Sequence, residues 1–313
     1  MVRFPAVVRK IPVTVIFVRT HRLLAWLGHA VELASIGLFG WCWIEERGTH
    51  RGRQVELLIA VAYGWILETF DLRLFGSYHY EPVTWWWVGG VPLYIPLLWA
   101  AILHSSMALS DRAGLPTWAR PFLDGLLAVV IDMAVDAIAI RTGFWRWNIS
   151  LHEGWFGVPA GNLCAWMWVA VWYGSTMRWM RQRVGSGAGA RWFRVFVPPV
   201  SYLGLLLSLW LIGFSGRLLG LERQNERLWF FAAHLVAFLL IVVIAKRWSC
   251  PVADVDRRVP ESLLCSRWLI HGSFTVILWA SGLWRQVPAL ILVCASSLLL
   301  EWSAQRWVMR RAD

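Results

Sequence analysis

The sequence predicts an all-α, polytopic transmembrane helix bundle, and three observations lead to that prediction. Of its 313 residues, 58% are hydrophobic and 16% are charged, whereas soluble domains are about 45–50% apolar and about 25% charged. The apolar residues gather in runs of about 20, which is the length that a helix needs to cross a bilayer. The net charge of +11 comes from Lys and Arg between these runs, where they fit loops facing anionic headgroups better than a nucleic-acid surface.

Eight apolar runs are long enough for a spanning helix, and a ninth is shorter. The eight runs cover residues 21–44, 54–75, 85–109, 121–140, 156–180, 192–214, 228–248 and 268–283. The ninth, residues 287–300, is short for a full crossing, so it is expected to be re-entrant or tilted against a neighbour. Glycine, proline or charged residues separate the runs. We therefore expect eight spans, or nine if the last run crosses.

A Gly- and Ser-rich segment at residues 185–189 divides the chain. Residues 1–184 form a motif-rich transmembrane half that is expected to hold the active site, and residues 190–313 form a plainer transmembrane half of the same integral domain. The expected location is a prokaryotic cytoplasmic membrane. With nine crossings, the loops on the side of the C-terminus carry more Lys and Arg and would face the cytoplasm, yet the basic N-terminal flank argues the reverse.

Acidic residues inside the apolar runs are the first candidates for chemistry, because each costs about 2.5–3.5 kcal/mol at the centre of a spanning helix. Asp132 and Asp136 lie one helical turn apart on one face, with Asp124 two turns earlier. Two carboxylates this close repel each other in a low-dielectric site, so one is expected to keep its proton near neutrality. A neutral acid beside a carboxylate is suited to general acid/base catalysis. The alternative is a polar contact between helices.

Other ionisable residues occur in the first two runs. Glu68 lies late in the second run, where its carboxylate could meet those of the fourth, whereas Asp71 and Arg73 are near its end and could only pair or reach the interface. In the first run, His29 and Glu32 share one helix face and fit either a proton relay or a satisfied polar pair.

Tryptophan is unusually frequent, with 25 residues, and aromatic belts at the membrane interface explain most of them. Some aromatic residues, however, follow the acids closely: Tyr78 and Tyr80 follow Glu68, and Trp145, Trp147, Trp155 and Trp166 follow the two aspartates. An aromatic-walled cavity suits a long apolar polyene, and Trp faces can stabilise a carbocation. No metal site is expected, because the five cysteines lack metal-ligand spacing and a single DxxxD is weak evidence for magnesium.

Six motifs together resemble the membrane carotenoid hydratases, of the bisanhydrobacterioruberin hydratase type. They are Tyr63-Gly64 before Glu68, Gly76-x-Tyr78-x-Tyr80, Val91-Pro92-Leu93-x-x-Pro96-Leu97-x-Trp99, Asp132-x-x-x-Asp136, Gly143-Phe-Trp-x-Trp147 and Gly157-Val-Pro159-x-x-Asn162. The resemblance covers about residues 63–166. Departures from the family pattern are Ala137 in place of proline, Trp155-Phe156 in place of two tyrosines, and Leu-Cys-Ala after Asn162. They bear on the substrate more than on the chemistry.

The resemblance implies that water adds to the terminal isoprenoid double bond of a linear carotenoid and gives a tertiary alcohol, with no cofactor. Asp132 or Asp136 would donate the proton, and the other aspartate or Glu68 would hold the attacking water. The implied substrate-binding residues are Tyr78, Tyr80, Trp99, Trp145, Trp147, Trp155 and Asn162. The implied partners are a linear carotenoid or another long polyene, membrane lipids and other carotenoid-pathway enzymes, without nucleic acid.

Three other functions are compatible with parts of the sequence. An intramembrane prenyltransferase would hold magnesium diphosphate with aspartate-rich motifs, but only one such motif is present. A carotenoid- or lipid-binding scaffold would explain the tryptophans but not two acids on one helical turn. A transporter would be expected to show an internal repeat, and none is obvious.

Overall fold

The computed structural model describes residues 13–49, 52–184, 194–248 and 259–309, and helices make up most of them, which confirms the all-α bundle. The Gly- and Ser-rich segment at 185–189 lies outside the described residues. The long helices are α1 (Val13–Thr49), α2 (Arg53–Phe70), α3 (Tyr94–Arg112), α4 (Arg120–Thr142), α5 (Ala160–Val184), α7 (Val197–Leu218), α8 (Gln224–Ala245), α9 (Glu261–Ala280) and α11 (Ala289–Met309). The short elements are η1 (Asp71–Phe75), η2 (Arg194–Phe196), η3 (Lys246–Trp248), α10 (Leu283–Gln286), β1 (Tyr78–Tyr80), β2 (Trp87–Val88), β3 (Val91–Pro92) and β4 (Trp145–Trp147).

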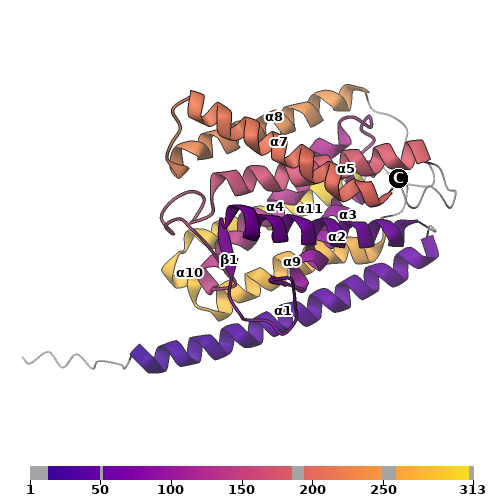
Figure 1. The fold of residues 1–313 in the computed structure, drawn as a ribbon. Helices are drawn as coiled ribbons and strands as arrows, with labels where there is room; N and C mark the ends of the chain where they lie inside the picture. The colour runs from indigo at the N-terminus through magenta and orange to yellow at the C-terminus, as the bar shows by residue number, and fades with distance from the viewer. Residues whose placement is uncertain (1–12, 50–51, 185–193, 249–258, 310–313) are drawn as a thin grey trace, which may run out of the picture.

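The helices pack side by side, with α2, α3, α4 and α5 in the middle of the bundle (Figure 1). Helices α7 and α8 cover one side of this group, through α5 and also through α2 and α4. On the other side α9 and α11 pack against α3 and α4, and α1 runs along the outside against α3 and α9. The C-terminal helices therefore enclose the motif-rich helices from two sides, and both halves of the chain share one core.

Four stretches within the described residues are long and apolar enough to cross a membrane: Ala25–Arg47, Arg194–Leu218, Gln224–Trp248 and Glu261–Ala280. They belong to the outer helices α1, α7, α8 and α9. The inner helices are of spanning length but carry more charge, as α4 does with Asp124, Asp132 and Asp136, all of them buried. Neighbouring helices cover these charges, which is the arrangement expected of ionisable groups in a membrane bundle.

The predicted boundaries differ most from those of the helices in two of the runs. The third helix begins at Tyr94 rather than at residue 85, because β2 and β3 form a hairpin turned by Gly89 and Gly90, which have φ of 64° and 90°. Two consecutive glycines with positive φ favour this type of turn. The last run is longer than its apolar part suggests, since α11 has 21 residues, which is enough for a crossing.

Two helix-ending glycines bring β1 and β4 together. Gly76 ends η1 with a φ of 56°, and Gly143 ends α4 with a φ of 81°, both in the left-handed region that glycine adopts without a steric penalty. The strands that follow pair antiparallel, with Tyr78 opposite Trp147 and Tyr80 opposite Trp145. Because side chains alternate along a strand, these four aromatic rings share one face of the small sheet.

Glu32 and His29 on α1 hold the loop before α3. The buried Glu32 carboxylate accepts hydrogen bonds from the backbone N–H groups of Trp85 at 2.9 Å and Trp86 at 3.0 Å. The His29 ring stacks on Trp85, with ring centroids 3.8 Å apart. The sequence left two alternatives for this pair, a proton relay and a satisfied polar contact, and the contacts of Glu32 fit the second. Glu32 thereby fixes the loop in which Trp87 lies beside Tyr80.

Candidate functional site

A pocket of about 150 Å³ lies among α2, α3, α4 and α5, near the end of the bundle that carries β1 and β4. Its walls are mainly apolar and aromatic. Its acidic side chains are Glu68, Asp71 and Asp136, and Asn162 adds an amide. Small-molecule sites in proteins commonly combine apolar walls with a few convergent polar groups in this way.

Glu68 is held by three neutral donors. Its Oε2 accepts hydrogen bonds from the hydroxyls of Tyr78 and Tyr80, the second at 2.5 Å, and its Oε1 accepts one of 2.7 Å from Nε1 of Trp99. Three donors stabilise a carboxylate without neutralising its charge. The indole reaches Glu68 because Gly64 lets α3 approach α2 closely: a Cβ at Gly64 would lie 2.6 Å from Cβ of Trp99.

Asp132 and Asp136 face Asn162 on α5. Nδ2 of Asn162 donates to Oδ2 of Asp136 at 2.5 Å and to Oδ2 of Asp132 at 3.3 Å. Asp136 lines the pocket and is near the indoles of Trp145 and Trp147, whereas Asp132 lies behind it and is fully buried. Both carboxyl groups are close enough to Glu68 to interact with it electrostatically. The structure therefore brings the three predicted acids into one cluster.

In the part of the chain that the structure describes, no basic side chain compensates the charge of this cluster. Among the described residues, no Lys, Arg or His forms an ion pair with Glu68, Asp132 or Asp136. The nearest basic residue along α4, Arg141, instead donates to the carbonyls of Leu151 and Phe156 in the following loop. Two buried polar atoms also lack a hydrogen-bond partner in the described structure, Oδ1 of Asp132 and Nε1 of Trp147. Polar atoms without a hydrogen-bond partner in the described structure therefore lie beside an apolar cavity.

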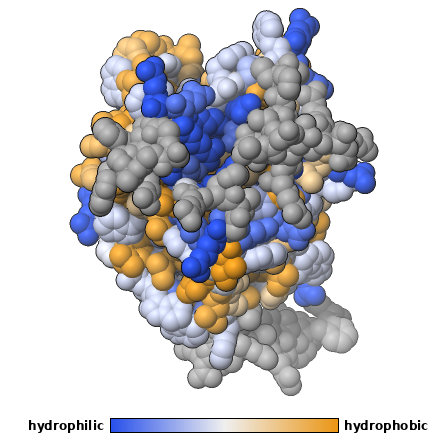
Figure 2. Space-filling view, turned by 90° about the vertical axis from the view of Figure 1, so that its right-hand side faces the viewer, coloured by the Kyte–Doolittle hydropathy of each residue, from blue (hydrophilic) through white to orange (hydrophobic). Residues whose placement is uncertain are grey.

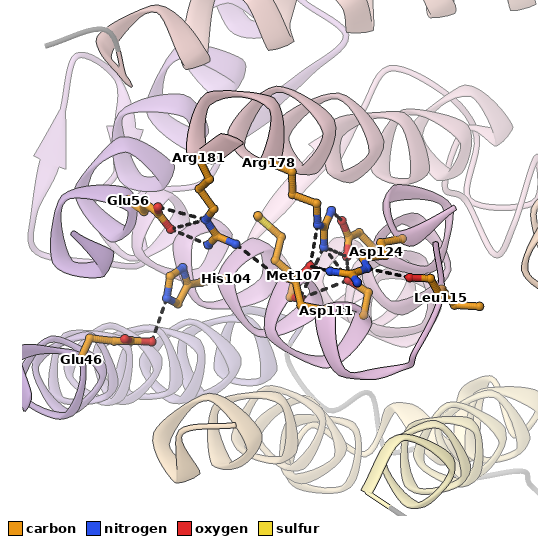
Figure 3. A network of polar contacts seen from close by, with 11 residues as sticks. Glu46, Glu56, His104, Met107, Asp111, Leu115, Asp124, Arg178 and Arg181 are labelled. Carbon is orange, nitrogen blue, oxygen red and sulfur yellow. Dashed lines mark hydrogen bonds and ion pairs between the residues drawn. The ribbon is translucent and has the colours of Figure 1, made fainter. Parts of the chain in front are cut away.

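The acids at the other end of the same four helices are fully paired (Figure 3). Arg178 on α5 donates to Asp111 at 2.7 Å and to Asp124 at 2.5 Å. Arg181 joins Asp111, at 3.0 Å, to Glu56 on α2, at 2.5 Å. Asp124 thus belongs to a structural ion network and lies away from the pocket. Glu56, Asp111 and Asp124 thus each have an arginine partner, whereas Glu68, Asp132 and Asp136 have none among the described residues.

The paired network lies toward the polar end of the bundle. Figure 2 views the end on the right-hand side of Figure 1, where α2 begins and α5 ends, and shows hydrophilic side chains across its middle with hydrophobic side chains on its flanks. An apolar flank around a polar end is the pattern of a bundle embedded in lipid with its end in water.

The pocket contains most of the predicted site residues. Glu68, Tyr78, Tyr80, Trp99, Asp136, Trp145, Trp147 and Asn162 line it, and Asp132 lies directly behind. Trp155 lies outside the lining and donates from Nε1 to the Met133 carbonyl at 2.9 Å, so it fixes the loop before α5 to α4. Its predicted contact with substrate has no support in this geometry.

Two residues that the sequence analysis considered but did not assign to the site also line the pocket, Trp166 and Asp71 on η1, and the Trp166 ring lies near that of Trp99 with centroids 4.2 Å apart. Sequence reasoning missed a further part of the wall. The second half of the chain adds side chains from α7 and α9: Tyr202, Leu205, Leu206, Leu209, Ile270 and Phe274. The apolar residues carry no chemical motif, so only packing identifies them. Within the described residues, no three His, Cys, Asp or Glu side chains are grouped so that they could hold a metal ion.

Comparison with known proteins gives one match. A family model described as "carotenoid biosynthesis protein" matches residues 29–220, which is more than half of the chain and includes every ionisable residue of the pocket. No curated protein and no solved structure matches the chain.

Proposed function

Because this chain belongs to the carotenoid biosynthesis protein family, we propose that it is a hydratase that adds water to the terminal isoprenoid C=C bond of a linear carotenoid. The observation that supports this most is a cluster of three buried acids, Glu68, Asp132 and Asp136, which have no basic partner in the described part of the chain and lie beside an apolar, tryptophan-lined pocket. Protonation of an unactivated alkene requires a neutral acid in a dry site, and the product cation requires walls that stabilise it.

The first step is proton transfer from the aspartate pair. Two carboxyl groups one turn apart, with no cation beside them, share at least one proton, because two negative charges there would repel strongly. Asp136 lines the pocket, so its carboxyl group delivers the proton to the terminal alkene carbon, and Asp132 and Asn162 orient it. The C=C π electrons form the new C–H bond and leave a tertiary cation at the adjacent carbon.

The second step is capture of that cation by water. The indole faces of Trp145 and Trp147 stabilise the positive charge by cation–π interaction, and the negative carboxylate of Glu68 lies within electrostatic range. A water oxygen forms the C–O bond, and a carboxylate of the cluster takes the released proton. One molecule of water is added in total, and no proton is consumed. The tertiary alcohol then leaves the site.

The test is expression of this chain in a bacterium that accumulates lycopene, with mass analysis of the extracted pigments. We expect pigments heavier than lycopene by one or two waters, and none in cells that express Asp136→Asn at the same level. Lycopene that is unchanged in the presence of correctly inserted wild-type protein would contradict the proposal. Lycopene that co-purifies unaltered with the protein would then favour a pigment-binding scaffold.

A further inference from the structure

The burial of the lining side chains distinguishes a closed end of the pocket from an open end. At the closed end its wall consists of fully packed apolar side chains from three helices: Ile102 on α3, Ile131 and Val135 on α4, and Ile270 and Phe274 on α9. At the open end the lining includes Phe75 on η1, which is 60% exposed, and the half-buried Tyr202, Leu206 and Leu209 on α7. The opening therefore lies between η1 and α7, on the side of the bundle.

The surroundings of this opening are apolar. Helix α7 belongs to a stretch with a mean hydropathy of 2.0, and its neighbouring side chains Leu203 and Leu207 are 65% and 53% exposed. On the facing element, Leu74 is 64% exposed. Side chains of this kind at mid-helix face hydrocarbon in a membrane bundle. The pocket therefore opens toward the lipid layer.

The backbone on one side of the opening is unusual. Residues Asp71–Phe75 form a π-helix that continues α2, and such short π-helical turns occur frequently at functional sites. Directly before it, Phe70 contacts Tyr202 of α7, with ring centroids 5.3 Å apart. This contact packs α2 against α7 at the point where η1 begins.

The volume of the pocket limits what it encloses. An apolar cavity of about 150 Å³ accommodates a molecule of about the size of benzene, and the pocket has about this volume. The terminal group of an isoprenoid chain matches this size, but a complete linear carotenoid is many times longer. The remainder of a bound substrate must lie outside the pocket. The opening between η1 and α7 is where the chain would pass from the pocket to the outside of the bundle.

We propose that this opening is a lateral entry port at which a long apolar isoprenoid chain binds, with its end group in the pocket and its chain along Phe75, Tyr202, Leu206 and Leu209. This inference rests on the proposed function for the identity of the substrate. The closed apolar end sets how far the chain can enter, so only a terminal double bond reaches Asp136. Each binding event therefore exposes one end of the chain to the acids.

The port is tested by binding rather than by turnover. Leu206→Trp and Leu209→Trp narrow the opening, whereas Leu203→Trp and Leu207→Trp add the same bulk on the exposed face of α7. We expect lycopene retained by the purified protein to fall about tenfold in the first pair, equivalent to about 1.4 kcal/mol, and to stay at the wild-type level in the second. Equal retention in both pairs, or an equal loss in both, would overturn the proposal.

A second measurement uses wild-type protein, so that the proposal can be tested even if a tryptophan variant fails to fold. A long-chain isoprenoid with a photoreactive diazirine at mid-chain is cross-linked to wild-type protein in liposomes, and the labelled peptides are mapped. Labelling of 202–209 on α7 or of 70–75 is expected, and labelling confined to α8 or α1 would overturn the port. Wild-type protein that labels at the port yet forms no hydrated product would refute the proposed reaction and leave the port intact. Formation of the hydrated product with labelling only elsewhere would support the proposed reaction and refute the port.

Discussion

Nδ2 of Asn162 lies 2.5 Å from Oδ2 of Asp136 and donates a hydrogen bond to it across the interface between α5 and α4. The same amide group reaches Asp132 at 3.3 Å. The side chain of Asn162 thus fixes both aspartates. It belongs to α5, and the sequence of α4 alone does not show that α5 packs there. The close packing of α4 on α5 therefore positions the acid that the proposed reaction requires.

Replacing either aspartate by asparagine tests the proton donor. Asp136→Asn and Asp132→Asn keep the size of the side chain but remove the transferable proton, so hydrated pigment should fall by about 10²–10⁴-fold. The measurement is product per unit of membrane-inserted protein, and Glu153→Gln on the exposed loop is the control. If both asparagine variants retain the wild-type rate, the aspartate pair is not the acid.

The tyrosine donors to Glu68 are tested by removing one hydroxyl. Tyr78→Phe leaves the carboxylate with two of its three donors, and loss of a hydrogen bond to a charged group costs about 1.5–3 kcal/mol. We expect the hydration rate to fall by at least about tenfold. Tyr63→Phe is the matched control, because its buried hydroxyl has no partner among the described residues. Equal rates in the two variants would contradict a role for the Glu68 carboxylate.

The ion network at the other end is expected to serve stability. Arg178→Met leaves the buried Asp124 without its arginine, and removal of one partner of a buried pair costs about 3–5 kcal/mol. The variant should unfold at a clearly lower temperature in detergent, whereas Arg183→Met on the exposed end of α5 should change stability by less than about 0.5 kcal/mol. An unchanged melting temperature for Arg178→Met would show that the network is dispensable.

The end of the bundle that carries the pocket should face away from the cytoplasm. The loops at the opposite end hold more of the Lys and Arg residues, and such loops remain in the cytoplasm. A cysteine at exposed His79 on β1 should therefore react with a membrane-impermeant maleimide added to intact cells, and a cysteine at Arg183 should not. Wild-type protein gives the background from the native cysteines. Labelling at position 183 but not at position 79 would show that the pocket end faces the cytoplasm and would contradict this prediction.

The sequence predicted the helical elements well because apolar runs of spanning length have few alternatives in a membrane. The largest difference, at residues 85–93, arises where three consecutive tryptophans precede Gly89 and Gly90: their hydropathy resembles that of a span, but the glycines form a turn. The length of α11 was underestimated because polar residues, including the buried Glu301, interrupt the apolar pattern of its last turns. Glu301 is paired with Arg267 of α9, at 2.6 Å, and this pairing is not visible in the sequence of either helix.

The acids of the site could be predicted because carboxylates in apolar runs are rare and two of them lie one turn apart. Helix periodicity placed Asp132 and Asp136 on one face, and strand alternation explains why Tyr78 and Tyr80 both reach Glu68. The port could not be predicted, because Leu206 and Leu209 differ from their lipid-facing neighbours only in the direction of their side chains. That direction depends on how α7 packs against α2 and α5.

The most direct test of the account is hydration of lycopene by purified protein in liposomes prepared in oxygen-18 water. The account predicts a tertiary alcohol that carries one oxygen-18 atom per reacted end with wild-type protein, and a strongly reduced yield with Asp136→Asn. Two results would contradict it: no alcohol from a folded wild-type protein that binds lycopene, or an alcohol whose yield is unaffected by the loss of the Asp136 carboxyl group.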